Sequence, residues 1–297
     1  MEICESIDNL RMRLKGREED IVFVPTMGNI HEGHLSLIEI GKKHGKFIVC
    51  SIFINPLQFD DVEDFRTYPR TIYSDIEKLS DAEVNVLFLP SEEVLFPQPQ
   101  VFFVVPPDNL SKILEGYFRK DFFIGVTTIV LKLLQCARPK VAVFGKKDFQ
   151  QALILEKMCS QFQIPTEIIL GETVREDDGL AVSSRNSKLS KTERVDSAYL
   201  YKVMEEAVFN ILALHDESAL NKAEIAKIES SSMNKLFLKG WKPEYFAVRV
   251  KSNLEKPFKT EGQKVIVDDL IILTAAWIGV NRLIDNLEIG SKSSTKI

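Results

Sequence analysis

Short apolar runs alternate with longer stretches of helical periodicity through the first 170 residues, and this alternation constrains the fold most strongly. The runs are β-branched or aromatic and mostly continuous, as expected of strands covered on both faces. They occupy residues 21–25, 47–54, 84–89, 141–144 and 166–170, separated by helix-like spacing at residues 34–43, 75–82, 127–137 and 149–162. Such alternation produces a parallel sheet with right-handed crossovers, so the sequence predicts an α/β domain.

The pattern changes after about residue 175. Residues 191–215 are expected to form one long amphipathic helix, which a polar stretch rich in Asp, Ser, Asn and Lys follows. Apolar runs at residues 244–250, 264–279 and 281–286 predict strands close enough in sequence to pair antiparallel. We therefore expect domains of residues 1–175 and 176–297, the second a smaller α+β domain with a frayed polar tail at 290–297.

Composition excludes several classes of protein. The chain has 297 residues, of which 45% are apolar and 27% charged, which is globular composition. A net charge of −5 argues against a surface built mainly for nucleic acid. No apolar run reaches the roughly 20 residues of a membrane span, and the start of the chain lacks the apolar core of a signal peptide. Cys4, Cys50, Cys136 and Cys159 form no CxxC motif, so we expect a reduced, cytoplasmic protein.

Two of the four histidines, His31 and His34, lie between the first predicted strand and its helix. Ligands collect where parallel strands end, and a helix N-terminus there suits a phosphate. Two imidazoles can donate hydrogen bonds to phosphate oxygens, more strongly if protonated. Gly28 and Gly33 let the backbone approach such a group. The pattern therefore indicates phosphate handling in nucleotidyl transfer.

Two other interpretations of this pair stay open from spacing alone. One or both histidines could cap the helix or pack locally. A metal site is the second, but HExxH places its ligands at i and i+4, and "HEGH" has neither that spacing nor a clear third ligand. We therefore assign no metal ligand.

Polar residues also follow other predicted strands. Asn55 and Gln58 come after the second strand, and their carboxamides suit a small hydroxy acid because they donate and accept. An Asn-Pro turn would explain Asn55 but not Gln58. In "FGKKDFQQ", Lys147 could meet phosphate and Asp148 could accept from ribose hydroxyls, although a charged helix start is common.

A hydroxyl-rich loop lies in the region where the domain boundary is expected. Ser183 and Ser184 precede Arg185, and hydroxyls followed by a forked donor suit a triphosphate. Taken alone, "SSRN" would more often be an ordinary polar loop.

Read together and in order, these stretches resemble the pantoate–β-alanine ligases, or pantothenate synthetases, of the HxGH nucleotidyltransferase superfamily. The likeness covers nearly the whole chain and includes "NPLQF", "YPRT", "LEG", "VLKLLQ", "KDFQQ", "DGLAVSSRN" and "RLIDN". It implies a Rossmann-like amino-terminal domain, a smaller carboxyl-terminal lid and a homodimer. It also implies that ATP activates (R)-pantoate as a pantoyl adenylate, which β-alanine converts to pantothenate, with Mg²⁺ accompanying ATP.

The resemblance also implies roles for individual residues. Those implied at the catalytic phosphates are His31, His34, Lys147, Ser183, Ser184 and Arg185. Those implied elsewhere around ATP are Pro25, Thr26, Met27, Gly28, Gly145, Asp148, Val174 and Val182. Those implied at pantoate are Asn55, Gln58, Tyr68, Arg119 and Gln151.

The chain departs from the family pattern at two places. Lys146 stands where the family usually has glutamate, which reverses a charge beside the expected nucleotide site. Lys120 and Phe122 replace the usual proline and histidine, whereas Arg119 and Phe123 are kept. The second change bears on loop order and pantoate binding.

Two rival functions are weighed against this one. Another HxGH nucleotidyltransferase, acting on a cofactor precursor, would keep the histidine pair but would have no reason for Gln58 and Gln151. A non-catalytic relative would be expected to lose its phosphate contacts, yet the implied phosphate-binding residues are all present.

Overall fold

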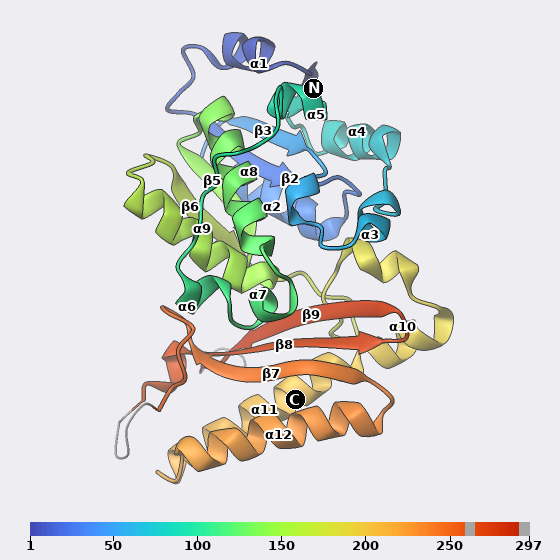
Figure 1. The fold of residues 1–297 in the computed structure, drawn as a ribbon, viewed down its shortest axis with the longest axis vertical. Helices are drawn as coiled ribbons and strands as arrows, with labels where there is room; N and C mark the ends of the chain where they lie inside the picture. Colours follow the sequence, from blue (N-terminus) through green and yellow to red (C-terminus); the bar gives the residue numbers. More distant parts are fainter. Residues whose placement is uncertain (259–264, 291–297) are drawn as a thin grey trace. The chain divides into compact units, whose positions relative to one another are not determined.

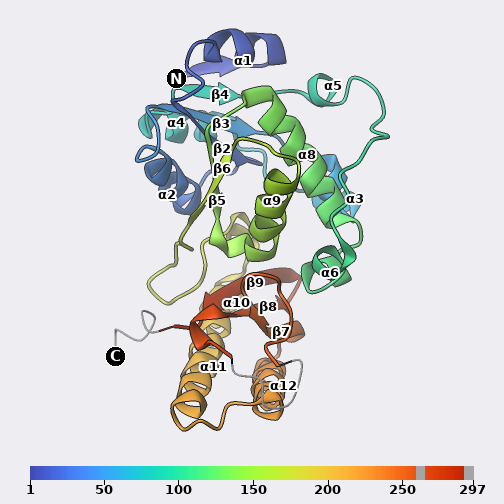
Figure 2. The same ribbon diagram turned by 90° about the vertical axis from the view of Figure 1, so that its left-hand side faces the viewer.

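The computed structural model describes residues 1–258 and 265–290, which are drawn in Figures 1 and 2. Two compact units are present. The first comprises residues 1–174 and 182–184, and the second comprises residues 175–181 and those from 185 onward. The segment 182–184 thus belongs to the first unit although the residues on both sides of it belong to the second.

A six-stranded parallel sheet forms the centre of the first unit. Its strands are β1 (Glu2–Cys4), β2 (Ile21–Thr26), β3 (Phe47–Ile52), β4 (Val86–Phe88), β5 (Val141–Gly145) and β6 (Glu167–Gly171), in the order β1-β4-β3-β2-β5-β6. Every neighbouring pair is parallel, which confirms the α/β prediction. Only β1 was missed; it has three residues, two of them exposed, and so carries no continuous apolar signal.

Helices cover both faces of this sheet. The helices of this unit are α1 (Ile7–Leu14), α2 (Glu32–Gly41), α3 (Val62–Arg66), α4 (Ile72–Asp81), α5 (Glu92–Leu95), α6 (Asp108–Ser111), α7 (Glu115–Phe118), α8 (Phe122–Ala137) and α9 (Phe149–Gln161). Figure 2 shows α2 and α4 on one face and α8 and α9 on the other. Leu37 and Ile38 of α2 and Leu79 of α4 share one buried cluster with the strands.

The strand order reverses between β2 and β5. From β2 the chain proceeds outward to β3 and then β4, whereas β5 and β6 lie on the other side of β2. Such a reversal opens a crevice at the carboxyl ends of the two strands, where ligands bind in sheets of this kind. The segments that follow β2 and β5 are therefore brought to one place.

The second unit contains an antiparallel sheet of three strands in the order β7-β8-β9. These are β7 (Lys242–Val250), β8 (Leu270–Ile278) and β9 (Asn281–Glu288), and the helices are α10 (Lys191–Ser197), α11 (Tyr199–Asp216) and α12 (Lys222–Leu238). Figure 1 shows α11 and α12 along the sheet. Met204 and Ile211 of α11 and Leu236 of α12 pack with Ile272 of β8 in one core, so this unit is the predicted small α+β domain.

Three expectations need correction here. The single helix predicted over 191–215 is two helices, because the chain leaves helical pairing at Ala198. The polar stretch after it contains α12, whose start is capped by the Asn221 side chain. In the strand predicted over 264–279, a 3₁₀ turn at Val267–Asp269 precedes β8; Lys264 and the tail 291–297 lie outside the described residues.

No helix within residues 1–258 and 265–290 has the length and apolar character that crossing a membrane requires.

Candidate functional site

The turn after β2 has a tightly held backbone. Thr26 Oγ1 donates to the Ser51 carbonyl at 2.8 Å and accepts from the Gly28 N–H at 3.1 Å. Gly28 and Asn29 both adopt left-handed backbone conformations, with φ of +82° and +52°, which glycine and asparagine tolerate best. The turn places His31 at the N-cap position of α2.

The two predicted histidines lie against each other. Their rings are stacked with centroids 4.0 Å apart and 25° between the planes. The backbone N–H of His31 donates to Nδ1 of His34 at 3.4 Å. Nδ1 of a neutral His34 is therefore the acceptor, and Nε2 carries the proton. His34 is consequently set to donate a hydrogen bond through Nε2.

Burial and neighbouring cations keep both imidazoles neutral. The pKa of His31 is lowered from 6.5 to about 4, by burial first and then by the charges of Lys147 and Lys78. The pKa of His34 is lowered to about 3, by burial first and then by His31, Lys147 and Lys78. Near neutral pH the pair thus acts as uncharged donors beside two lysines.

These pKa values predict a loss of stability in mild acid. Below pH 6.5, His31 and His34 bind protons in the unfolded chain but stay unprotonated in the folded protein. The free energy of unfolding therefore falls as the pH drops toward the pKa values of the two histidines in the folded protein. At pH 5 each histidine reduces the free energy of unfolding by up to about 2 kcal/mol. Urea unfolding at pH 7.5 and pH 5 should show a smaller loss for a double variant, His31→Asn with His34→Asn, than for the wild type. Equal losses would contradict the prediction, and His44→Asn, at an exposed position, is the control.

The segment after β3 places a carboxamide beside this turn. Asn55 is 1% exposed and caps the short 3₁₀ helix η1 (Pro56–Gln58) by accepting from the Leu57 N–H at 3.2 Å. Its Nδ2 donates to Gln58 Oε1 at 2.9 Å and to the Gly125 carbonyl at 3.2 Å. Gln58 Nε2 in turn donates to Met27 Sδ at 3.2 Å. Gln58 therefore lies next to the turn that carries the histidines.

Arg119, at the C-cap of α7, holds the same segment. It donates to the Gln58 carbonyl at 2.9 Å and lies 3.6 Å from an Asp60 carboxylate oxygen. Its guanidinium lies over the Phe122 ring, 3.7 Å from the centroid. Phe122, which departs from the family pattern, thus supplies an apolar face for the arginine.

The end of β5 continues into the 3₁₀ turn η2 (Lys146–Asp148). Lys146 pairs with Glu172 at 2.5 Å, so the charge reversal at this position is met by a carboxylate beyond β6. Lys147 and Asp148 lie close enough to His31 for their charges to shift its pKa in opposite directions. The structure therefore brings together the segments that follow β2 and β5, as expected where the strand order of the sheet reverses (the switch point of the sheet).

The hydroxyl-rich loop that contains Ser183 and Ser184 also contacts the turn after β2. Within the first unit, the Val182 N–H donates to the Val174 carbonyl at 2.9 Å, and Asn29 Nδ2 donates to the Ser184 carbonyl at 3.4 Å. Ser183 lies between these two contacts. Arg185 is the first residue of the chain that returns to the second unit.

The remaining predicted residues lie on the surrounding elements. Pro25 is in β2 and Gly145 ends β5. Tyr68 is 8% exposed and packs edge-on against Phe59, with the ring centroids 5.6 Å apart. Gln151 is half-buried in the first turn of α9.

Sequence reasoning missed Asp75 and Lys78 of α4, which contact the histidine turn. A signal was present. Ile72, Ile76 and Leu79 mark the apolar face of this helix, and Asp75 falls on the same face by spacing. A buried carboxylate is rare without partners. An aspartate on the apolar face of a helix therefore predicts hydrogen-bond partners from another segment of the chain.

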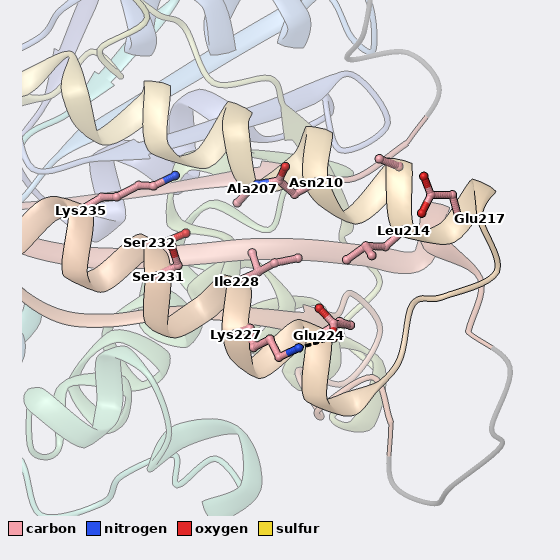
Figure 3. A pocket seen from close by; sticks show the side chains of 11 residues that line it. Ala207, Asn210, Leu214, Glu217, Glu224, Lys227, Ile228, Ser231, Ser232 and Lys235 are labelled. Carbon is pink, nitrogen blue, oxygen red and sulfur yellow. Dashed lines mark hydrogen bonds and ion pairs between the residues drawn. The ribbon is translucent and has the colours of Figure 1, made fainter.

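A separate pocket lies in the second unit. It has a volume of about 370 Å³. Figure 3 shows its lining side chains on α11 and α12. Glu224 and Lys227 form an ion pair of 2.5 Å at its wall, and Ala207 and Ser232 also line it. No residue predicted for the site lines this pocket.

Comparison with known proteins supports one family. The sequence model of the family described as pantoate–β-alanine ligase matches residues 2–288. A pantothenate synthetase structure from Thermus thermophilus is 33% identical with a TM-score of 0.86, covering 97% of this chain and 99% of its own. A pantoate–β-alanine ligase from Francisella tularensis, complexed with β-γ ATP and β-alanine, is 33% identical with a TM-score of 0.78 and 97% coverage of each chain. The chain therefore belongs to the pantoate–β-alanine ligase family.

Proposed function

We propose that this enzyme condenses (R)-pantoate with β-alanine at the expense of ATP, giving pantothenate, AMP and pyrophosphate. The family match along residues 2–288 carries the proposal. The site adds support because neutral histidine donors and lysines lie beside a carboxamide, Gln58, at the switch point of the sheet. This arrangement supports recognition of phosphate and of a hydroxy acid in one place.

The reaction proceeds in two displacements. A pantoate carboxylate oxygen attacks the α-phosphorus of ATP, the bond to the β-phosphate oxygen breaks, and pyrophosphate leaves. The amine of β-alanine then attacks the carbonyl of the bound pantoyl adenylate, loses a proton, and displaces AMP. No protein nucleophile is required, so catalysis consists of positioning and of stabilising charge on the phosphates.

Residue roles follow from the same scheme. His34 donates from Nε2 to a phosphate oxygen, and His31 and Lys147 stabilise the negative charge that grows during adenylation. The residues proposed to contact the rest of ATP are Pro25, Thr26, Met27, Gly28, Gly145, Asp148, Val174, Val182, Ser183, Ser184 and Arg185. Those proposed for pantoate are Gln58, Gln151, Asn55, Tyr68 and Arg119. Arg119 and Asn55 act largely by fixing Gln58, to which both are bonded.

Mg²⁺ is proposed to accompany ATP, held through phosphate oxygens and water. The charged side chains that act on the histidine pair include Lys147 and Lys78, which suit phosphate oxygens rather than a cation. The ion would neutralise phosphate charge. No group of three or more His, Cys, Asp or Glu side chains arranged for a metal occurs in the described ranges.

We also propose the broader setting of the enzyme. Residues 1–175 would bind ATP and pantoate and residues 176–297 would act as a lid. A homodimer would cover part of the exposed apolar segment that contains Val101, Phe102 and Val105. The buried, free cysteines suit a reducing cytoplasm. Light scattering on the purified protein tests the dimer.

Pyrophosphate release from Mg-ATP tests the reaction. Pantoate alone should give stoichiometric release, and β-alanine should convert this to continuous turnover with AMP as product. Release that needs another acceptor, with the nucleotide retained in the product, would instead identify a different HxGH nucleotidyltransferase. No pantoate-dependent release from folded protein would overturn the proposal.

A further inference from the structure

The carboxylate of Asp75 is buried against the backbone of the histidine turn. Asp75 is 1% exposed. Its Oδ2 accepts from the Asn29 N–H at 2.9 Å, and its Oδ1 accepts from the Ile30 N–H at 2.8 Å. Thr71 Oγ1 lies 3.1 Å from both carboxylate oxygens. Because a carboxylate only accepts, it satisfies all three donors at once.

Lys78 holds the other side of the same peptide. Its Nζ donates to the Ile30 carbonyl at 2.7 Å. Asp75 and Lys78 are three residues apart in α4 and therefore lie on one face of the helix. Both backbone polar groups of Ile30, the residue directly before His31, are thus bonded to side chains of α4.

The turn needs such an external support. Asn29 is a non-glycine residue in the left-handed region, with φ of +52°, and such a conformation persists only when surrounding contacts hold it. A side chain at Gly28 would place its Cβ only 3.1 Å from Asp75 Oδ2, so glycine leaves room for the carboxylate. Beside Asp75 on the same buried face, α4 packs into the sheet core through Ile72, Ile76 and Leu79, which makes it a rigid base.

We propose that Asp75 and Lys78 are positioning residues that clamp the turn of Gly28–Ile30 onto α4, and thereby hold His31 and His34 where ATP phosphates bind. This inference rests on the proposed function. The clamp consists only of the protein's own side chains and backbone, so it would preorganise the site for ATP.

Asp75→Asn is the principal test. The amide keeps the size of the carboxylate but turns one acceptor into a donor that faces a backbone N–H. We expect KM for ATP to rise and the rate of pyrophosphate release to fall, together roughly 10- to 100-fold in kcat/KM for ATP, with KM for pantoate little changed. Asp81→Asn, at the exposed end of the same helix, should behave as the wild type.

The histidines themselves provide a readout that does not depend on activity. The chain has only four, so imidazole NMR signals of His31 and His34 can be followed against His44 and His215. Asp75→Asn should shift the first two signals and leave the others in place. Combined with His34→Ala, it should add little to the loss caused by that variant alone, whereas a purely structural effect would add in full.

Lys78→Met keeps the test decisive if Asp75→Asn fails to fold. It removes only the bond to the Ile30 carbonyl and one nearby charge, and should raise the pKa of both histidines and KM for ATP. Wild-type imidazole signals and wild-type ATP kinetics in the folded variants would overturn the clamp. Failure of the wild type to release pyrophosphate with pantoate would instead overturn the proposed function, since the NMR comparison needs no substrate.

Discussion

His34→Ala should lower the rate of pantoate-dependent pyrophosphate release by roughly 100- to 1,000-fold, the effect expected when one preorganised donor to a developing charge is removed. In the structure the His34 side chain accepts a hydrogen bond from the His31 N–H at 3.4 Å. Loss of this long bond should change the free energy of unfolding by no more than about 1.5 kcal/mol. A single-turnover assay measures the rate, and urea unfolding followed by far-UV circular dichroism measures the stability.

The control for this variant is His44→Ala. His44 lies just beyond the other end of α2, so its removal should leave adenylation unchanged. A His34→Ala protein that cannot fold would assign this residue to the core. One with normal activity would remove it from the chemistry.

Gly125→Ala should damage pantoate use about as severely. In α8 the new Cβ would lie 2.1 Å from the Leu57 carbonyl oxygen and 2.9 Å from the Gln58 nitrogen. Both contacts are backbone, so rotation of a side chain cannot relieve them and η1 must move. Because Asn55 also bonds the Gly125 carbonyl, the displacement would reach the whole segment that carries Gln58.

We expect kcat/KM for pantoate to fall roughly 100-fold, since small displacements of positioning groups carry losses of this size. Stability should also fall by about 1–3 kcal/mol from overpacking, although alanine normally favours a helix. KM for ATP should change little. Gly16→Ala, whose Cβ would meet nothing within 4 Å but whose backbone has a φ of +78°, is the control for backbone strain without a clash and should leave pantoate kinetics unchanged. Unaltered pantoate kinetics in Gly125→Ala would show that η1 does not position the acid.

Much of the fold could be predicted because local patterns carried it. Strands β2 and β3 are almost fully buried and therefore appear as continuous apolar runs. Helix α12 was missed because only a narrow part of it is buried, including Ile225 and Leu236. The break at Ala198 was missed because apolar periodicity continues across it while the helical pairing is interrupted.

The residues of the candidate site also fall into those that the sequence could predict and those that it could not. His31, His34 and Gln58 follow strands in the sequence, so the rule that ligands collect at strand ends could select them. Their roles stay predictions. Asp75 and Lys78 could not be selected in this manner, because the turn they hold lies more than 40 residues earlier in the chain. The long-range bond itself leaves no trace in either segment; the position of Asp75 on the apolar face of α4 indicates only that this carboxylate is buried and needs partners.

The neutral histidine pair has a consequence for the cell. With pKa values of about 4 and about 3, neither imidazole changes charge as cellular acidity varies around neutrality. The pair behaves as a fixed arrangement of dipoles rather than as a proton sensor. Protonation of these two side chains would therefore contribute no pH dependence to adenylation near neutrality.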